Sequence, residues 1–500
     1  MTLEKMKLVP ENALTVLRTL EEHGYKGHLV GGCVRDILKD KKPKDWDIAT
    51  DAKPDQIQAL FPKTVYENAF GTVAVIFENK GEIDNIDPTA TVIEVTPYRA
   101  EGTYSDKRHP DSVSFMTDVL YDLKRRDFTI NAMAMSFTGE LTDPFDGQGD
   151  LELKIIKAVG NPTDRFEEDA LRILRAIRFS TQLGFVIEQG TADAMLKNKE
   201  LVKELSQERI HDEFVKMIMS PDPVLAVALM ERFGILEYII PELREGIACE
   251  QGGAHIFDVF EHLLHALGHA AEKNWPLEVR IAALFHDIGK PRSRRLAPSL
   301  LGKAPSKKYT FYGHEVIGAR MAQKIMERLK FPKKVTDLVV TLVRQHMFFS
   351  DTETITLSAV RRVVAKVGKD NIWTLMDIRE CDRVGMKKKE APYRLRKYHA
   401  MIEEVLRDPI SVSQLKVDGT ILMNELGIKP SPRMGWMLHA LLEEVLDDPL
   451  KNTRDYLDKR VGELDKLSDL ELKKLGEQGK EAKEALEGEE VAKLHKKHGV

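Results

Sequence analysis

Cysteine is scarce in this chain of 500 residues, which contains only Cys33, Cys249 and Cys381. The three positions are far apart and odd in number, so the sequence offers neither a disulfide framework nor a paired-cysteine zinc site. Long apolar runs are also absent, because no stretch reaches the roughly 18 apolar residues that a membrane helix needs. We therefore expect a protein of the reducing cytoplasm, with no signal peptide and no membrane span.

The chain also lacks a strong excess of one charge sign, with 75 Lys and Arg against 80 Asp and Glu. Its formal net charge of −5 does not mark a nucleic-acid-binding protein, so any RNA contact must come from a local basic face. Hydrophobic residues make up 42% of the chain. At this length such a chain can bury several cores, which indicates about two to four domains.

Hydrophobic periodicity divides the chain into a short mixed part and a long helical part. β-rich runs such as GHLV, DWDIAT and TVIEVTPY alternate with helical patterns from about residue 25 to 135. From Leu151 onward, apolar residues recur at helical spacing. We predict an α+β fold, in which a head with a small mixed sheet and helices is followed by an elongated all-α body.

The first candidate site is the segment HLVGGCVRDILKDKKPKDWDIAT. A strand is predicted to end at Val30, and Gly31 and Gly32 let the backbone approach a ligand before a helix starts near Cys33. The free N–H groups of that helix start, together with Arg35, are suited to triphosphate oxygens. A Gly-Gly turn alone is more often a plain tight turn, so this hypothesis depends on the chemistry of the residues after the turn.

Two carboxylates come after that turn. Asp45 and Asp47 flank Trp46 at the start of an apolar run, where the alternation of a strand puts both on one face. Two desolvated aspartates repel each other unless a cation lies between them, so they predict a Mg²⁺ site for phosphoryl transfer. Glu94, in the run TVIEVTPY, is either a third catalytic carboxylate or a water-facing edge residue, and the sequence leaves both alternatives open.

Two further blocks supply arginines. LKRRDFTINAMA places Arg125, Arg126 and Asp127 at the predicted start of a helix that carries Asn131, which suits a triphosphate, a ribose or a surface charge cluster. RFEEDALRILRAIRF carries charged residues at intervals of three, predicted to follow one side of a helix: Asp169, Arg172, Arg175 and Arg178. An Asp acceptor beside an Arg donor fork can read the edge of a base, although such pairs are also common on helix surfaces.

LVGGCVRD followed by DWD resembles the signature of the class II tRNA nucleotidyltransferases and bacterial poly(A) polymerases, which belong to the polymerase-beta-like nucleotidyltransferases. The resemblance implies a polymerase-beta-like head in which Asp45 and Asp47 hold Mg²⁺. It also implies that Asp169 and Arg172 act as an amino-acid template that selects CTP and ATP. Nucleotide binding is predicted for Gly31, Gly32, Arg35, Arg126, Asp127, Asn131, Asp169, Arg172, Arg175 and Arg178.

Two segments near these blocks resemble further family elements. YRAEGTYSDKRHPDSVSF, with Gly102, Lys107 and Arg108, is similar to the flexible loop of CCA-adding and A-adding members, which disfavours an enzyme that adds only CC. ERIHDEFVKM is similar to a motif of the neck that follows the head. We interpret the charged residues of that motif as mainly structural: Glu208, Arg209 and Glu213.

The helical body contains a second set of candidate metal ligands. His286 and Asp287 form a His-Asp pair at the end of an apolar helix, where unpaired polar groups are costly. The full set, in an order that resembles the HD phosphohydrolase domain, is His262, His286, Asp287, His314, His346 and Asp382. The resemblance implies a site for one or two divalent ions and activity on nucleotide or cyclic-phosphate ends. Asp377 is the rival of Asp382 for the last position.

We predict five regions: a catalytic head at 1–150, a neck with the base-selecting helix and an RNA-binding surface at 151–240, an HD domain at 241–400, a helical region at 401–456 and a charged tail at 457–500. The predicted function is template-independent addition of CCA to the 3′ end of tRNA, with CTP and ATP as substrates. An A-adding enzyme and a poly(A) polymerase remain alternatives. From other classes, an HD phosphohydrolase with a non-catalytic RNA-binding head and an RNA chaperone also remain.

Overall fold

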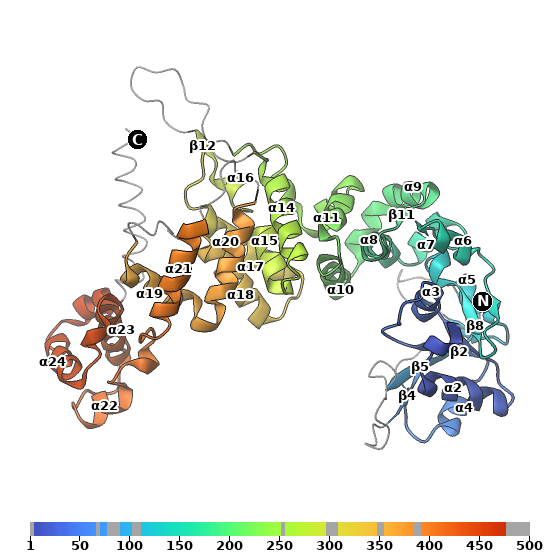
Figure 1. The fold of residues 1–500 in the computed structure, drawn as a ribbon, viewed down its shortest axis with the longest axis horizontal. Coiled ribbons are helices and arrows are strands. Elements are labelled where there is room, and N and C mark those ends of the chain that lie inside the picture. Colours follow the sequence, from blue (N-terminus) through green and yellow to red (C-terminus); the bar gives the residue numbers. More distant parts are fainter. Residues whose placement is uncertain are drawn as a thin grey trace. The chain divides into compact units, whose positions relative to one another are not determined.

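The computed structural model describes residues 5–66, 71–77, 91–102, 112–251, 256–296, 309–347, 355–384 and 392–476. It divides into two compact units, Met1–Pro241 and Glu242–Val500, and each is described by itself (Figure 1). Within the described ranges, no helix is both long enough and apolar enough to cross a membrane.

A mixed sheet forms the N-terminal part of the first unit. Among the described residues its strand order is β3-β4-β5-β2-β1-β8-β9, and β2 runs parallel to β5 while the other neighbours are antiparallel. The strands are β1 (Gly27–Val30), β2 (Asp47–Thr50), β3 (Thr64–Tyr66), β4 (Val73–Ile76), β5 (Val92–Pro97), β8 (Ala134–Ser136) and β9 (Leu141–Thr142). Two short strands beside it, β6 (Arg99–Glu101) and β7 (Val113–Phe115), form an antiparallel pair.

The two faces of the sheet have different cores, because successive side chains of a strand point to opposite sides. On one face, Ile48 and Val95 are buried in the main head core with helices α2 (Glu11–Glu22), α3 (Gly32–Leu38) and α4 (Pro54–Leu60). On the other face, Ala49 packs with Leu123 of helix α5 (Val119–Lys124). Asp47 has the same orientation as Ala49, so it lies on the face that carries α5.

Helices complete the first unit. After α6 (Gly147–Glu152) they are α7 (Pro162–Glu168), α8 (Leu171–Leu183), α9 (Gln189–Asn198), α10 (Gln207–Ile218), α11 (Pro223–Arg232), α12 (Leu236–Ile239) and α13 (Pro241–Arg244), the last of which crosses the unit boundary. A two-stranded parallel pair, β10 (Ile155–Ile156) and β11 (Val186–Ile187), joins the segment before α7 to the segment after α8. Helix α8 ends at Gly184, whose left-handed φ of 70° is a common way to stop a helix.

Where the structure describes the second unit, its named elements are helices apart from the short strand pair β12 (Arg295–Leu296) and β13 (Tyr309–Thr310). Its helices are α14 (Val259–Glu272), α15 (Leu277–Phe285), α16 (Lys290–Ser293), α17 (His314–Arg328), α18 (Lys333–Gln345), α19 (Leu357–Val367), α20 (Ile372–Asp382), α21 (Pro392–Val405), α22 (Gly419–Asn424), α23 (Pro432–Asp447) and α24 (Arg454–Leu464). Helix α15 is buried without interruption from Val279 to Phe285, which makes it a central helix of this unit.

The predicted α+β head and helical body are confirmed. The prediction that a solvated, charged tail begins at residue 457 is wrong for its first part, because Leu457, Val461, Leu464 and Leu472 are buried in a C-terminal core with α22 and α23. The apolar residues of this Glu- and Lys-rich stretch are few, but they fall on one helical face. Residues 477–500 lie outside the described part of the chain.

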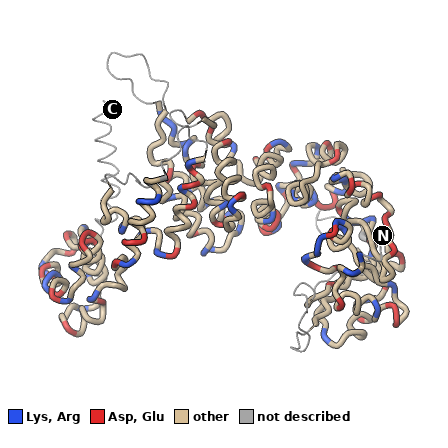
Figure 2. Tube along the Cα trace, viewed as in Figure 1, with Lys and Arg blue, Asp and Glu red and all other residues tan. Residues whose placement is uncertain are grey.

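Basic and acidic residues are interspersed along both units (Figure 2). This mixture agrees with the nearly balanced totals of 75 basic and 80 acidic residues. Binding sites in this protein are therefore formed by local groups of side chains, and one such group lies on the sheet face that carries Asp47.

Candidate active sites

Asp47 and Glu94 are neighbours across the parallel pair β2 and β5. They are partners in the strand register, and the N–H of Glu94 donates to the carbonyl oxygen of Trp46 at 3.2 Å. Trp46 is completely buried on the core side and fixes the start of β2, whereas Glu94 is exposed. The water-facing alternative for Glu94 is therefore correct in its exposure but wrong in its position, because β5 has a neighbour on each side and is not an edge strand. Glu94 faces water on the same sheet face as Asp47, and Asp45 is exposed just before the strand.

The pKa of Asp47 is raised to about 6. Burial is the main cause, and the carboxylate of Asp45 adds to it, while the guanidinium of Arg126 acts in the opposite direction. A carboxylate under these conditions is ionised most readily when a cation binds beside it. The position therefore fits a metal ligand, as the two neighbouring carboxylates Asp45 and Glu94 do.

Gly31 lies where a guanidinium and a carboxylate approach the backbone together. Its φ is 77°, a left-handed value, and a Cβ at this position would lie 2.7 Å from Nη1 of Arg126 and 3.6 Å from Oδ2 of Asp47. A side chain here is therefore strained by the backbone conformation and would displace the Arg126 guanidinium. Helix α3 begins at the next residue, Gly32. This places Arg126 between the predicted triphosphate loop and the predicted metal ligand.

Asp122, which the sequence analysis did not select, holds Arg125 and Arg126. Its side chain is completely buried, and Oδ2 accepts from Nε and Nη2 of Arg126 at 3.2 and 3.0 Å, while Oδ1 accepts from Nη2 of Arg125 at 2.5 Å. Burial would raise the pKa of Asp122, but the two guanidinium groups outweigh it and lower the pKa. The sequence does contain a signal for these ion pairs, because Arg125 and Arg126 follow Asp122 by three and four residues, the spacing that brings side chains together on a helix.

The RRD block does not open a helix, contrary to the prediction. Helix α5 ends at Lys124, and Asn131 belongs to a separate 3₁₀ turn, Thr129–Asn131. The residues of the block are nevertheless brought together with the glycine loop and the neck. Arg35 donates to Oδ1 of Asn131 at 2.8 Å, and Nδ2 of Asn131 donates to Asp127 at 3.2 Å.

Asp127 extends this chain of contacts to helix α8, because Nε of Arg175 donates to its Oδ2 at 2.7 Å. Burial would raise the pKa of Asp127, yet the Arg175 guanidinium and the hydrogen bonds lower it to about 2. The residues Arg35, Asn131, Asp127 and Arg175 thus form one continuous polar network. It connects the first turn of α3 with the middle of α8.

Asp169 does not share a helix with the arginines that follow it, so this part of the prediction is wrong. Helix α7 ends at Glu168, Asp169 is extended with φ −149° and ψ 102°, and α8 begins at Leu171. The carboxylate accepts from the N–H of Leu171 at 3.0 Å, and this local hydrogen bond favours a break before α8. Its other oxygen accepts from Nη2 of Arg209 at 2.7 Å.

Arg172 and Arg178, both on α8, are largely buried and held by different parts of the unit. Nη2 of Arg172 donates to the carbonyl oxygen of Arg125 at 3.0 Å, and its Nη1 donates to Glu168 at 2.7 Å. Nε of Arg178 donates to Glu213 at 2.6 Å, and its guanidinium lies 4.1 Å from the centre of the Phe179 ring. Arg172 therefore faces the head, and Arg178 faces α10.

Arg209 and Glu213, interpreted as mainly structural, each hold a residue predicted to bind the nucleotide. They are four residues apart on α10 and therefore lie on one face of that helix. Arg209 holds Asp169, and Glu213 holds Arg178. The predicted loop residues Lys107 and Arg108 lie outside the described residues, so their position relative to this network is not described.

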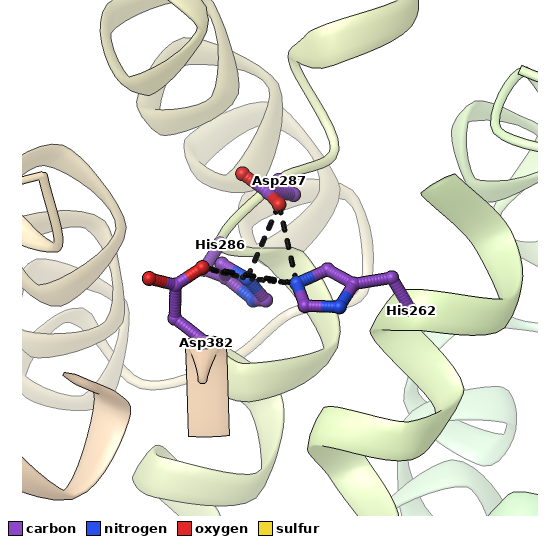
Figure 3. Close-up of side chains that lie close together, drawn as sticks. All are labelled: His262, His286, Asp287 and Asp382. Atoms are coloured by element: carbon purple, nitrogen blue, oxygen red, sulfur yellow. Dashed lines mark hydrogen bonds and ion pairs between the residues drawn. The ribbon is translucent and has the colours of Figure 1, made fainter. Parts of the chain in front are cut away.

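The six predicted HD ligands of the second unit converge on one buried cluster. His262 comes from α14, His286 and Asp287 follow α15, and Asp382 ends α20 (Figure 3). Oδ2 of Asp287 lies 3.4 Å from Nε2 of His262 and 3.3 Å from Nε2 of His286. Oδ1 of Asp382 lies 3.6 Å from Nε2 of His286, so the structure places Asp382 and not Asp377 in the cluster.

Asp287 also contacts a second group of ligands through its other oxygen. Oδ1 lies 3.2 Å from Nε2 of His314 and 3.5 Å from Nε2 of His346. These three residues form a group whose donor atoms lie within 4.8 Å of one another, as do His262, His286, Asp287 and Asp382. A carboxylate with one oxygen in each group can bridge two divalent ions.

Three of the four histidines of the cluster are oriented by backbone carbonyl groups. Nδ1 of His286, His314 and His346 lies 2.8, 2.7 and 2.7 Å from the carbonyl oxygens of Ala283, Phe311 and Val343. A carbonyl oxygen can only accept, so each Nδ1 carries a proton and each Nε2 is directed at the cluster, where a metal ion would take the place of a second proton. This is the usual arrangement of metal-binding histidines.

Electrostatics in the cluster favour a positive charge. Burial alone would lower the pKa of His286, but the carboxylates of Asp287 and Asp382 outweigh it and raise the pKa to about 10. Burial would raise the pKa of Asp287, but Lys290 and His286 hold it well below its ordinary value. Lys290, which the sequence analysis missed, lies 2.5 Å from Asp287 and 2.6 Å from Gln251. The donor set therefore fits divalent cations.

Comparison with known families agrees with this geometry. The poly A polymerase head domain matches residues 27–157, the probable RNA and SrmB-binding site of polymerase A matches 184–247, and the HD domain matches 259–387. The CCA-adding enzyme of Lactobacillus delbrueckii subsp. bulgaricus is 46% identical over 211 residues, or 42% of this chain and 50% of that enzyme. The Geobacillus thermodenitrificans CCA-adding enzyme is 39% identical over 294 residues, or 58% of this chain and 66% of that enzyme. The chain thus spans between half and two thirds of the length of these curated relatives.

Solved structures match a larger part of the chain. The structure of the Bacillus stearothermophilus CCA-adding enzyme in complex with CTP covers 91% of this chain and 98% of its own, with 26% identity and a TM-score of 0.66. The Thermotoga maritima CCA-adding enzyme complexed with tRNA ending in CCA has the same fold, with 18% identity and a TM-score of 0.52. The order of head, RNA-binding segment and HD domain, together with these similarities, shows that the chain belongs to the class II tRNA nucleotidyltransferase and poly(A) polymerase family and carries an HD domain.

Proposed function

We propose that the chain adds CCA, or the missing part of CCA, to the 3′ end of tRNA, with CTP and ATP as substrates and no nucleic-acid template. The terminal 3′-OH attacks the α-phosphate of the nucleotide, and pyrophosphate leaves. The observation that carries this proposal is the similarity over 91% of the chain to a CCA-adding enzyme in complex with CTP. The alternatives within the family are addition of A alone and synthesis of a poly(A) tract.

The metal ligands proposed for the reaction are Asp45, Asp47 and Glu94. Family membership implies the use of a divalent metal ion, and we propose Mg²⁺ because the donors are carboxylate oxygens. When bound, Mg²⁺ lowers the pKa of the attacking hydroxyl and stabilises the developing charge on the leaving oxygen. The register of Asp47 with Glu94 keeps their backbones adjacent.

The triphosphate is proposed to bind beside Gly31 and Gly32, where Arg35 and Arg126 supply positive charge. Arg126 is held by the buried Asp122, and Arg35 by Asn131, so both guanidinium groups have fixed orientations before a nucleotide binds. Fixed donors lose little conformational freedom when the phosphate arrives. The missing side chain at Gly31 leaves room for this approach.

Base selection is proposed for Asp169 and Arg172, with Arg175 and Arg178 as supporting nucleotide contacts. Cytosine and adenine both present an amino donor beside a ring-nitrogen acceptor. A carboxylate can only accept and a guanidinium can only donate, so this pair matches both bases. Uracil and guanine present a carbonyl acceptor beside an N–H donor. The carbonyl oxygen would then face the carboxylate and the N–H would face the guanidinium, so neither hydrogen bond can form.

This proposal is tested with tRNA transcripts that end before CCA, after CC, and after CCA, each incubated with single nucleotides and with CTP plus ATP. We expect CTP addition to the first, ATP addition to the second, and no addition to the third. Addition of A alone to the second transcript, with no use of CTP on the first, would favour the A-adding alternative.

We propose a second activity, metal-dependent hydrolysis of phosphate esters, for the HD cluster. The observation that favours it is the convergence of the other five predicted ligands on Asp287. The test measures hydrolysis of 2′,3′-cyclic nucleotides to nucleoside 2′- or 3′-monophosphates by the full chain and by Asp287→Asn with added Mn²⁺, Ni²⁺ or Mg²⁺. Loss of this activity in the variant supports the proposal, and equal activity contradicts it. We also propose the division of the chain into five regions: head, neck, HD domain, C-terminal helical region and tail.

A further inference from the structure

The carboxylate of Asp169 is held by Arg209, an arginine of helix α10, which is distant from Asp169 in the chain. Nη2 of Arg209 lies 2.7 Å from Oδ2 of Asp169, and only 20% and 18% of the two side chains are exposed. Arg209 lies in the first turn of α10, beside α8 (Figure 1). The pair therefore joins the segment between α7 and α8 to a separate helix.

Both oxygens of Asp169 have a protein donor in this arrangement. Oδ1 accepts from the backbone N–H of Leu171 at 3.0 Å, while Oδ2 accepts from Arg209. Two donors from different elements fix the plane of the carboxylate, because rotation about its terminal bond would break at least one hydrogen bond. Each oxygen has a further lone-pair direction, which remains usable by an amino group of a base.

The same helix holds the next part of the base-selecting region in a similar way. Glu213, one turn after Arg209, accepts from Nε of Arg178 at 2.6 Å, and its side chain is 3% exposed. Helix α10 therefore contacts the predicted template at Asp169 through a cation, and the helix that follows it at Arg178 through an anion. The charge pattern of α10 is complementary to that of the segment it holds.

We propose that Arg209 is a positioning residue that determines nucleotide specificity, because it fixes Asp169 as an oriented acceptor that requires an amino donor on the incoming base. This inference rests on the proposed nucleotide addition. Without Arg209, the Asp169 side chain can rotate about its bonds. Its oxygens are then no longer held against the carbonyl oxygen of uracil or guanine, so the repulsion that rejects these bases is weakened. Discrimination is then lost more than catalysis, since the metal ligands and Arg126 are not touched.

The test compares single-nucleotide addition of CTP, ATP, UTP and GTP to tRNA transcripts by the wild type and by Arg209→Gln and Arg209→Lys. The matched control is Glu208→Gln, because Glu208 is an exposed neighbour on the same helix. For Arg209→Gln we expect the ratio of kcat/KM for CTP and ATP to that for UTP and GTP to fall at least about tenfold. Arg209→Lys, which keeps a cationic donor, is expected to restore part of the ratio, and Glu208→Gln to leave it unchanged.

A loss of activity by the same factor for all four nucleotides, with an unchanged ratio, would overturn this inference and make Arg209 structural. An unchanged ratio at wild-type activity would overturn it as well. If Arg209→Gln does not fold, as judged by circular dichroism and thermal unfolding, the ratio of Arg209→Lys decides by the same criterion. Absence of CTP and ATP addition by the wild type would instead refute the proposed function itself, so the two failures are distinguishable.

Discussion

The two proposed metal centres of this chain differ in how completely the fold prepares them. In the HD cluster, donor atoms from five helices and their ends lie within 4.8 Å of one another in two groups that share Asp287, and all six ligands are buried. In the head, Asp45 and Glu94 are exposed, and within the described ranges the head carboxylates form no such close group. The fold thus assembles one centre in advance and leaves the other open.

This difference arises from the chemistry of the ligands. Imidazole rings held by backbone carbonyls present fixed lone pairs, so a cluster of them is suited to retaining a metal ion without substrate. Carboxylates on an open sheet face are suited to Mg²⁺, which keeps part of its water shell and commonly binds together with substrate phosphates. We infer that the HD centre holds its metal permanently and that the head receives its metal with the nucleotide.

The largest effect is expected from a crossed pair of substitutions. Asp47→Asn should lower nucleotide addition to tRNA by at least about a thousandfold, because it removes a central metal ligand, while metal content and phosphate-ester hydrolysis of the HD centre stay unchanged. Asp287→Asn should lower the metal content and the phosphate-ester hydrolysis of the HD centre, while nucleotide addition to tRNA stays unchanged. Both activities are measured on each purified variant. Loss of both activities in either variant, with the fold intact, would break the comparison between independent centres.

A smaller effect is expected from one HD ligand. His346→Ala should weaken metal retention by about 10- to 100-fold, because the second group of the cluster then keeps only His314 and Asp287. The measurement is metal content after dialysis against a chelator series. Gln345→Ala, beside His346 at the end of α18, serves as the control. Equal retention by His346→Ala and wild type would contradict the assignment of the second group.

The pH dependence of nucleotide addition separates the centres further. Asp47 has a pKa raised to about 6, so at subsaturating Mg²⁺ addition should fall about tenfold per pH unit below that value, since the protonated carboxyl does not bind the ion. The pKa of Asp287 is held far lower, so its ionisation is not the cause of any loss near pH 6. Rates are measured from pH 5 to 8 at two Mg²⁺ concentrations. A profile that does not shift with Mg²⁺ would exclude Asp47 as the titrating ligand.

The same pKa shift affects folding with a defined sign. The folded pKa of Asp47 is above its ordinary value of 3.8, so the folded state binds more protons between about pH 4 and about pH 6. Stability contributed by this group is therefore present at low pH and is lost as the pH rises through about 6.

The smallest effect is expected at Gly31. Gly31→Ala should raise KM for CTP and ATP several-fold and destabilise the head by about 1–2 kcal/mol, because a Cβ meets Arg126 and the φ of 77° is unfavourable for alanine. Hydrolysis at the HD centre should not change. Gly160→Ala is a useful control, since Gly160 also has a positive φ, of 67°, but no atom within 4 Å of its Cβ position. Similar KM values for the two variants would show that close approach at Gly31 has no role in nucleotide binding.

The sequence predicted those site residues whose pattern is local. The end of a strand at Val30 and a helix start near Cys33 depend on neighbouring residues, and in the structure β1 ends at Val30 and α3 begins at Gly32. The alternation around Trp46 is found only in part, because β2 begins at Asp47 and Asp45 precedes it. Partners from distant segments could not be predicted, because the pairs of Arg209 with Asp169 and of Glu213 with Arg178 form only when α10 packs on α8. The helix break at Asp169 was missed since no Gly or Pro marks it, although an Asp just before an apolar run is a typical helix start.

The sequence of the product ends is the decisive test of the proposed function. A tRNA transcript that lacks CCA is incubated with the full chain, Mg²⁺, CTP and ATP, and the 3′ ends are sequenced after complete reaction. We predict that most ends read CCA and that addition then stops, while Asp47→Asn leaves the transcript unextended. Long A tracts, or no addition by a folded wild-type chain that binds tRNA, would contradict the proposed function.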